Sequence, residues 1–267
     1  MNNYTKKYYY HNANKNVKNR VASLLTLFLL STTFNHEIFF IEIGNFSLRP
    51  YMLVIFFGIT FMISSKIRIY VTKEQLSIIL LVFLFFIFAF STSLVSPYLD
   101  DSPFMFLRNA ILLFIQFLTV VFMCVIFNHI NDSEAFNAII TTLKFILVVA
   151  LLLYIYHIAS KGLINYSKSY LGVLYSYQGR PRLMGTVGDP NYFSLYITIY
   201  YWLYLFFSRK LAIKANNLIS ALFVISILLT QSRTAIIINT LAILILAFKE
   251  LHFKPKSLFP TLIYIEY

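Results

Sequence analysis

The sequence predicts an all-α polytopic transmembrane protein with about eight spans and a cytoplasmic N-terminus. Hydrophobic residues make up 59% of the 267 residues and charged residues only 12%, which is too little charge for the surface of a water-soluble domain of this length. Apolar runs of nearly bilayer-spanning length recur along the chain. These runs lack the strict alternation of a membrane β-barrel, so helices are expected.

Eight apolar stretches are long enough to cross a bilayer when tilt and interfacial ends are allowed for. These predicted spans are Val21–Phe34, Leu48–Ser64, Leu76–Leu94, Ala110–Phe127, Ile139–Ala159, Tyr192–Phe207, Leu218–Leu229 and Thr234–Phe248. The first and seventh are short, and we expect them to extend into their flanks. Two glutamates leave the boundary after the first span open, because residues 36–46 also fit a re-entrant or interfacial segment. A ninth span is expected to begin near Leu258.

The bounds of the predicted spans divide the chain into four parts. They are a cytoplasmic tail over residues 1–20, a bundle of about five spans over 21–159, an external loop over 160–191 and an incomplete transmembrane part over 192–267. The tail is polar and basic, and no small-residue cleavage site follows it. We therefore expect the first span to be retained rather than removed as a signal peptide.

The distribution of lysine and arginine sets the orientation, because cytoplasmic loops of membrane proteins are enriched in both. With the N-terminus inside, 14 of the 22 basic residues fall on the cytoplasmic side and seven on the external side, and Lys144 lies within a span. Four of the seven external charges belong to the loop over residues 160–191. The net charge of +12 is thus dispersed rather than gathered on one face, and no nucleic-acid partner is expected.

The sequence gives little reason to expect metal or redox chemistry. The single cysteine, Cys124, lies in an apolar run and has no second cysteine for an intrachain disulfide. The chain contains no HExxH motif, no phosphate-binding glycine loop and no metal-ligand spacing. Asp100 and Asp101 on an external loop fit a divalent-cation site, although adjacent carboxylates more often just solvate a turn. We expect no metal and no cofactor.

A polar stretch over residues 180–191 contains two arginines, two glycines and two prolines in an otherwise apolar region. Asp189 followed by Pro190 is a helix-start signal that needs no further function. Gly185 and Gly188 are explained equally simply, as loop positions with positive φ or close backbone contacts. A helix N-terminus also presents unpaired N–H groups and the positive end of a dipole, which suits an anionic ligand.

Arg182 in this stretch is open to two interpretations: a solvated loop charge or a ligand for an anion. The loop is rich in tyrosine, and an aromatic, basic external loop can stack on sugars and pair with phosphate oxygens. Arg180 is the weaker candidate of the two arginines. It is assigned a supporting role together with Gly185, Asp189 and Asn191.

A second polar island, residues 230–233, lies at the external turn between the seventh and eighth predicted spans. Ser232 or Thr230 is placed to cap the helix that begins near Thr234, and Ser232 is assigned a supporting role. Arg233 then stands at a helix start, where the dipole disfavours a cation. It either snorkels to the interface or is compensated by a bound anion.

Other titratable residues are weaker candidates. Lys144 lies in an apolar span, close enough to one end to snorkel. His157, at the external end of the fifth span, has the chemistry of a base, but a lone histidine at such a place is more often an interfacial residue. The same applies to His36 and Arg108, which also fall on the external side.

Two external motifs occur in order along the chain. The first is Arg182-x-x-Gly185-x-x-x-Asp189-Pro190-Asn191, and after a span and a basic loop the second is Leu229-Thr230-Gln231-Ser232-Arg233-Thr234-Ala235. The joint pattern resembles the O-antigen ligase and polysaccharide polymerase superfamily. The stretch over residues 44–51 is also similar to the N-terminal region of that superfamily.

The resemblance implies a metal-independent glycosyltransferase that uses a polyprenyl-diphosphate-linked glycan, such as one on undecaprenyl diphosphate, at the outer face of the cytoplasmic membrane. It implies that Arg182 and Arg233, which match the two motif arginines, hold the diphosphate. Tyr192 and the tyrosines before Arg180 are placed to line the glycan path, although no motif assigns them.

The resemblance also implies that a histidine in a later, large external loop deprotonates the acceptor hydroxyl. No histidine of this chain matches it, since His252 falls on the predicted cytoplasmic side. We expect that loop to lie beyond Tyr267 and this chain to lack the general base, which leaves its activity as an enzyme open.

Four roles remain open at this point. They are a polymerase that joins repeat units of capsule, exopolysaccharide or O-antigen, a ligase that transfers glycan to a lipid or protein, a flippase for lipid-linked oligosaccharides, and an inactive truncated remnant. A flippase is expected to carry charges at membrane depth on several helices, whereas only Lys144 clearly lies there. We expect a polymerase-like protein. Its expected partners are the lipid-linked glycan, the bilayer, and a chain-length regulator and flippase of the same pathway.

Overall fold

The computed structural model describes residues 15–43, 46–65, 71–94, 103–164, 169–176 and 179–253. This part of the chain is mostly helical, as predicted. Its α-helices are α2 (Lys15–Thr33), α3 (Pro50–Ser64), α4 (Lys73–Leu94), α5 (Pro103–His129), α6 (Asp132–Lys161), α7 (Pro190–Lys210), α8 (Asn217–Thr230) and α9 (Arg233–Phe253). Each of the eight predicted spans overlaps one of these helices, in the same order.

Three of the described helices contain stretches long and apolar enough to cross a membrane: Lys73–Thr92 in α4, Ala110–His129 in α5 and Asp132–Lys161, the whole of α6. They indicate a membrane protein, whereas eight spans remain a prediction. The helix of the first predicted span, α2, has 19 residues and begins at Lys15, within the segment predicted as the basic tail. The seventh gains one residue at each end, and α8 has 14 residues, which is about 21 Å of helix against a hydrocarbon core of about 30 Å.

Two small antiparallel sheets interrupt the helices, and the prediction of an all-α protein did not include them. The first sheet joins β1 (Ile41–Ile43) and β2 (Phe46–Leu48), and the second has the order β3 (Ser169–Tyr170), β4 (Gly172–Tyr175), β5 (Pro181–Gly185). A short 3-10 helix, η1 (Glu37–Phe39), precedes β1. Strands of two to five residues are too short to show a hydrophobic period in the sequence.

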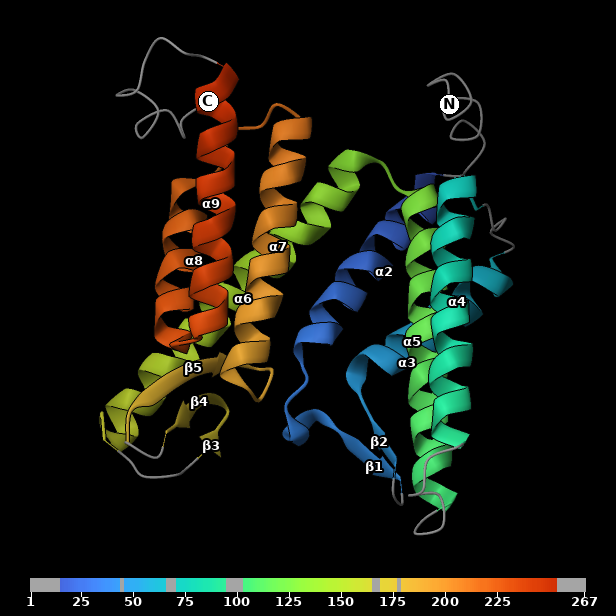
Figure 1. The fold of residues 1–267 in the computed structure, drawn as a ribbon, viewed down its shortest axis with the longest axis horizontal. Helices are drawn as coiled ribbons and strands as arrows, with labels where there is room; N and C mark the ends of the chain where they lie inside the picture. Colours follow the sequence, from blue (N-terminus) through green and yellow to red (C-terminus); the bar gives the residue numbers. More distant parts are fainter. Residues whose placement is uncertain are drawn as a thin grey trace. The chain divides into compact units, whose positions relative to one another are not determined.

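The chain divides into two compact units, and the first contains residues 1–32 and 38–138. Within it α4 and α5 lie side by side (Figure 1). The amides of Gln75 and Asn128 join these helices reciprocally: Gln75 Nε2 donates to Asn128 Oδ1 at 3.1 Å and Asn128 Nδ2 donates to Gln75 Oε1 at 2.7 Å. On α3, a Cβ at Gly58 would lie 2.5 Å from the Phe122 ring, so a glycine is needed for α3 and α5 to approach closely.

The second unit contains residues 33–37 and 139–267, and both motifs belong to it. In this unit α7 packs against β5, α8 and α9, and α8 also contacts β5 (Figure 1). The centre of its core is formed by side chains that are at most 1% exposed: Leu183, Met184, Phe193, Ile197 and Tyr204. The strand that carries the first motif is thus anchored by the same apolar residues that hold α7.

Candidate functional site

Asp189 begins α7 as the sequence predicts. Its backbone is extended (φ −143°), and its carboxylate accepts hydrogen bonds from the backbone N–H groups of Asn191 at 2.7 Å and Tyr192 at 3.0 Å. Pro190 follows at the first helical position, where a missing N–H costs nothing. The carboxylate therefore already occupies two of the N–H groups that an anion would otherwise contact. The helix-start interpretation of Asp189 and Pro190 is confirmed.

The two glycines of the motif adopt the left-handed backbone conformation expected of them. Gly185 has φ +55°, and a Cβ there would lie 2.5 Å from the ring of Phe193. Gly188 has φ +87°, and a Cβ there would lie 3.4 Å from both the Cα and the Cδ2 of His36. Gly185 thus allows β5 to pack against α7, and Gly188 allows a second segment to approach the loop.

The side chain of Arg182 connects the two motifs through a contact between residues 48 positions apart. Arg182 Nε donates to the backbone carbonyl of Thr230 at 3.0 Å, and Nη2 donates to Asn191 Oδ1 at 3.3 Å. Arg182 is half-buried. Its guanidinium is therefore held across the ends of three elements: β5, which carries it, the start of α7 and the end of α8. This geometry agrees with an Arg that is positioned rather than freely solvated.

The α8–α9 turn is fixed by contacts of its own. Gln231 adopts a left-handed conformation (φ 52°) and donates from Nε2 to the carbonyl of Pro181 at 3.2 Å. Thr230 and Ser232 are buried: Thr230 Oγ1 accepts from the Ser232 N–H at 3.3 Å, and Ser232 Oγ accepts from the Ala235 N–H at 3.5 Å. Gln231 was not predicted to contribute, although its place between two hydroxyl residues was the signal available in the sequence.

Arg233 is the first residue of α9 and is exposed. As predicted, the cation stands at a helix start, where the dipole opposes it. It follows Thr230, whose carbonyl Arg182 contacts, by three positions, so the Cα atoms of Thr230 and Arg233 lie within about 11 Å of each other. The fold thus brings both motif arginines to the same corner of the second unit.

A segment from the N-terminal part of the chain also contacts this corner. The backbone N–H groups of Asn35 and His36 both donate to the carbonyl of Thr186, at 3.1 and 3.0 Å, and Thr186 Oγ1 donates to the carbonyl of Thr33 at 2.7 Å. His36 is consequently held beside Gly188. Nothing in the local sequence indicates this contact, because it joins residues about 150 positions apart.

His157 lies elsewhere in the second unit. Its ring stacks on Tyr170, with centroids 5.2 Å apart and planes at 22°. Residue pairing in the sheet places Tyr170 opposite Val173, and Leu174, the next residue after Val173, opposite Arg182. Successive side chains of a strand point to opposite faces, so Tyr170 and Arg182 project from different faces of the sheet. The structure does not bring His157 together with the motif arginines.

Tyr175 secures the base of the same loop. Its hydroxyl donates to the carbonyl of Gly162 at 2.7 Å, and its ring meets Tyr170 edge to face. Burial raises the pKa of the Tyr175 phenol, and the neighbouring Tyr170 raises it further. The phenol therefore stays protonated and serves as a structural donor.

The remaining sequence candidates are dispersed. Arg180 and Tyr192 are exposed; the Arg180 carbonyl accepts from the Ser176 N–H at 3.0 Å and closes the β4–β5 turn. Lys144 is exposed near the middle of α6, and Cys124 is a free thiol. Asp100, Asp101 and the predicted ninth span fall outside the described residues, as do the side chains of Arg108 and His252. Within the described residues there is no group of three or more His, Cys, Asp or Glu side chains that could hold a metal ion.

No protein-family model, no curated protein and no solved structure matches this chain. The likeness to the O-antigen ligase and polysaccharide polymerase superfamily therefore rests on the motif residues themselves.

Proposed function

We propose that this protein is a polysaccharide polymerase-like glycosyltransferase of the cytoplasmic membrane, which binds polyprenyl-diphosphate-linked glycan at the external face. One observation carries the proposal. Arg182 reaches the carbonyl of Thr230, so the two polar motifs that bear the superfamily's pattern form a single corner with both arginines. In the proposed topology this corner is on the external side of the membrane, and the basic N-terminal segment is on the cytoplasmic side.

The chemistry that this corner would support is displacement at the anomeric carbon of the donor. The oxygen of an acceptor hydroxyl forms a bond to that carbon, the bond from the carbon to the diphosphate oxygen breaks, and the diphosphate leaves with the electron pair. The hydroxyl proton passes to a base. Guanidinium groups stabilise the developing charge on the leaving group, because they form charge-assisted, bidentate bonds to phosphate oxygens. Arg182 and Arg233 have this role in the proposal, with Asn191 holding the Arg182 guanidinium in place.

His36, in place of the histidine that the resemblance implies in a later loop, is the residue that we propose to test as the proton acceptor. Its backbone N–H donates a hydrogen bond to the carbonyl of Thr186, and its side chain lies beside Gly188; both partners belong to the motif loop. Replacing it with glutamine keeps the size and polarity but removes the base, so we expect transfer to fall at least tenfold. The same change at His157, on the other face of the β3–β5 sheet, is expected to leave transfer unchanged. Equal losses in both variants would contradict the role of His36.

The main experiment replaces each motif arginine with lysine. The variants Arg182→Lys and Arg233→Lys keep the charge but lose the planar, bidentate geometry, and each is expected to lower transfer by about 100-fold, the usual effect of removing a donor to a developing negative charge. The matched control is Arg20→Lys, because Arg20 is an exposed arginine of α2. The measurement is glycan chain length formed from polyprenyl-diphosphate-linked repeat units by the full-length protein in bilayers.

The products also separate the related activities. Loss of activity should leave single lipid-linked repeat units if the protein is a polymerase, and long glycan on the carrier if it is a ligase. Flipping of the carrier should survive both arginine-to-lysine changes. Unchanged chain length in both variants would overturn the diphosphate role.

A further inference from the structure

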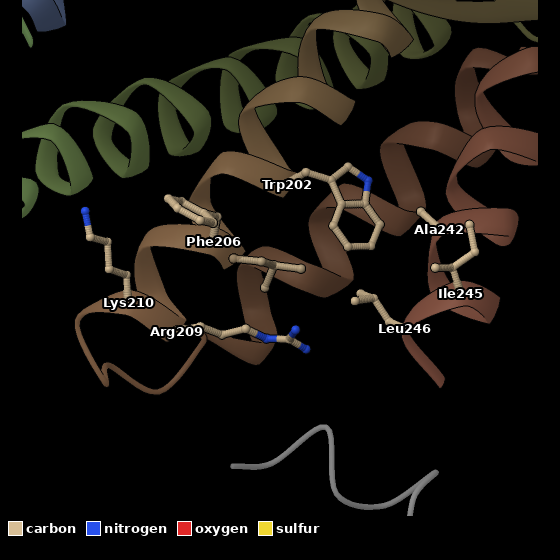
Figure 2. A pocket seen from close by; sticks show the side chains of 8 residues that line it. Trp202, Phe206, Arg209, Lys210, Ala242, Ile245 and Leu246 are labelled. Atoms are coloured by element: carbon tan, nitrogen blue, oxygen red, sulfur yellow. The ribbon is translucent and has the colours of Figure 1, made fainter. Parts of the chain in front are cut away.

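A groove lies between the C-terminal half of α7 and α9, far along α7 from the two motifs. It has a volume of about 640 Å³ and is lined by Trp202, Leu205, Phe206, Arg209, Lys210, Ala242, Ile245 and Leu246. This volume is within the range of small-molecule sites, about 300–1,000 Å³. Figure 2 shows Trp202 and Arg209 on the side of α7 that faces Leu246, with Arg209 nearer the end of the helix.

The wall of the groove is apolar, and its polar groups lie at one end. The indole N–H of Trp202 donates to Asn239 Oδ1 at 2.9 Å, so this donor is occupied and the ring offers an apolar surface. Phe206 and Ile245 are 57% and 66% exposed, which continues the apolar surface outward from the groove. The basic end is formed by Arg209, which is exposed in the last turn of α7. The next residue, Lys210, points the other way (Figure 2), and its ammonium lies 5.9 Å from the centroid of the Phe207 ring.

We propose that this groove binds an anionic phospholipid, with the phosphate at Arg209 and part of an acyl chain along Trp202 and Leu246. The occupant follows from the order of the surfaces: a long apolar wall, then the Arg209 cation at the level where α7 ends (Figure 2). An amphiphile with one anionic head and an apolar tail matches both. The favourable interaction of basic residues with a helix C-terminus is enough to explain why cations stand there. It does not explain why an apolar groove lies beside them. The proposal does not depend on the glycosyltransferase function.

The test uses the single tryptophan of the chain, which is Trp202 itself. The full-length protein is reconstituted in phosphatidylcholine bilayers that contain an equal fraction of brominated phosphatidylglycerol or brominated phosphatidylcholine. Bromine quenches tryptophan fluorescence only at short range, so quenching reports occupancy of the groove. We expect stronger quenching by the anionic lipid. The variant Arg209→Gln should lower the preference for it about fivefold, the effect of one basic residue near an anionic headgroup.

Lys214→Gln is the matched control, because Lys214 is exposed in the α7–α8 loop and does not line the groove. Equal quenching by both brominated lipids in the unmodified protein would overturn the proposal, as would an equal loss of preference in Arg209→Gln and Lys214→Gln. Ala242→Phe fills the groove from α9 and should reduce quenching by the anionic lipid. Unchanged quenching in that variant would show that no acyl chain enters.

Discussion

The two ends of α7 use polar residues in opposite ways. At the N-terminal end, Arg182 and Gln231 donate hydrogen bonds to backbone carbonyls 48 and 50 positions away in the sequence, and Asp189 accepts from backbone N–H groups of the first turn of α7. At the C-terminal end, about 30 Å away along the helix, Arg209 and Lys210 stand exposed at the rim of an apolar groove. The first end is a preorganised corner, and the second is an open surface. Substitutions at the N-terminal end of α7 should therefore lower the free energy of unfolding, whereas substitutions at the C-terminal end should lower the preference for anionic lipid.

The largest loss of stability is expected for Gly185→Val. The new side chain meets the Phe193 ring, and a β-branched residue is strained at φ +55°. We expect about 3 kcal/mol of destabilisation from overpacking and strain together, measured by denaturant unfolding in detergent micelles. Gly162→Ala is the control, because φ is also positive there (+83°) but nothing lies within 4 Å of the added Cβ; it should cost only about 1 kcal/mol. Similar losses in the two variants would show that the packing of β5 on α7 does not contribute to the stability of the protein.

Asn239→Leu should have the next largest effect, because it opens the link between α7 and α9. Asn239 is buried, accepts from Trp202 Nε1 at 2.9 Å, and donates to Thr198 Oγ1 at 2.9 Å. Leaving these partners unpaired is expected to cost about 1–2 kcal/mol and to shift the fluorescence of Trp202. Ile238→Leu at the exposed neighbouring position should change neither quantity. A fluorescence shift without loss of stability would mean that the network orients the indole rather than holding the helices.

Asp189→Ala removes the helix cap at the polar end of α7, and we expect a loss of about 1 kcal/mol. Asn216→Ala is a matched comparison, since Asn216 caps α8 through two backbone N–H groups in the same way. Both variants should lose similar stability in unfolding measurements. If Asp189 acts only as a cap, then transfer of glycan should fall no further in Asp189→Ala than in Asn216→Ala. A selective loss in Asp189→Ala would extend the candidate site to this carboxylate.

The smallest effect on stability is expected for Arg209→Gln. Arg209 is exposed in the last turn of α7, and an interaction between such a cation and the helix dipole contributes about 0.5 kcal/mol. Its unfolding midpoint should stay close to that of the unmodified protein while the lipid preference falls. A loss above about 1.5 kcal/mol in the same unfolding assay would place Arg209 in a structural contact, and the contrast between the two ends of α7 would disappear.

Sequence reasoning located the helices well and the contacts between them poorly. Each predicted span overlaps a helix because long apolar runs leave a chain in a membrane little other choice, and Asp189-Pro190 marked the start of α7 because its capping signal is local. The strands of the 160–191 loop were missed, since they are stabilised by packing against α7 and α8 rather than by their own periodicity. The contact between Gln231 and Pro181 could likewise not be predicted from the sequence.

What the sequence alone determined is the set of local features: an apolar, mostly helical chain, two glycines with positive φ, a capped α7 and an arginine at the start of α9. Only the tertiary structure decided that Arg182 contacts the Thr230 carbonyl, that His36 lies beside Gly188, and that His157 lies apart from both. The physical reason is the distance along the chain over which each interaction acts. Caps, turns and apolar runs act within a few residues, whereas these contacts depend on which side chains fill the space between helices and strands distant in the chain.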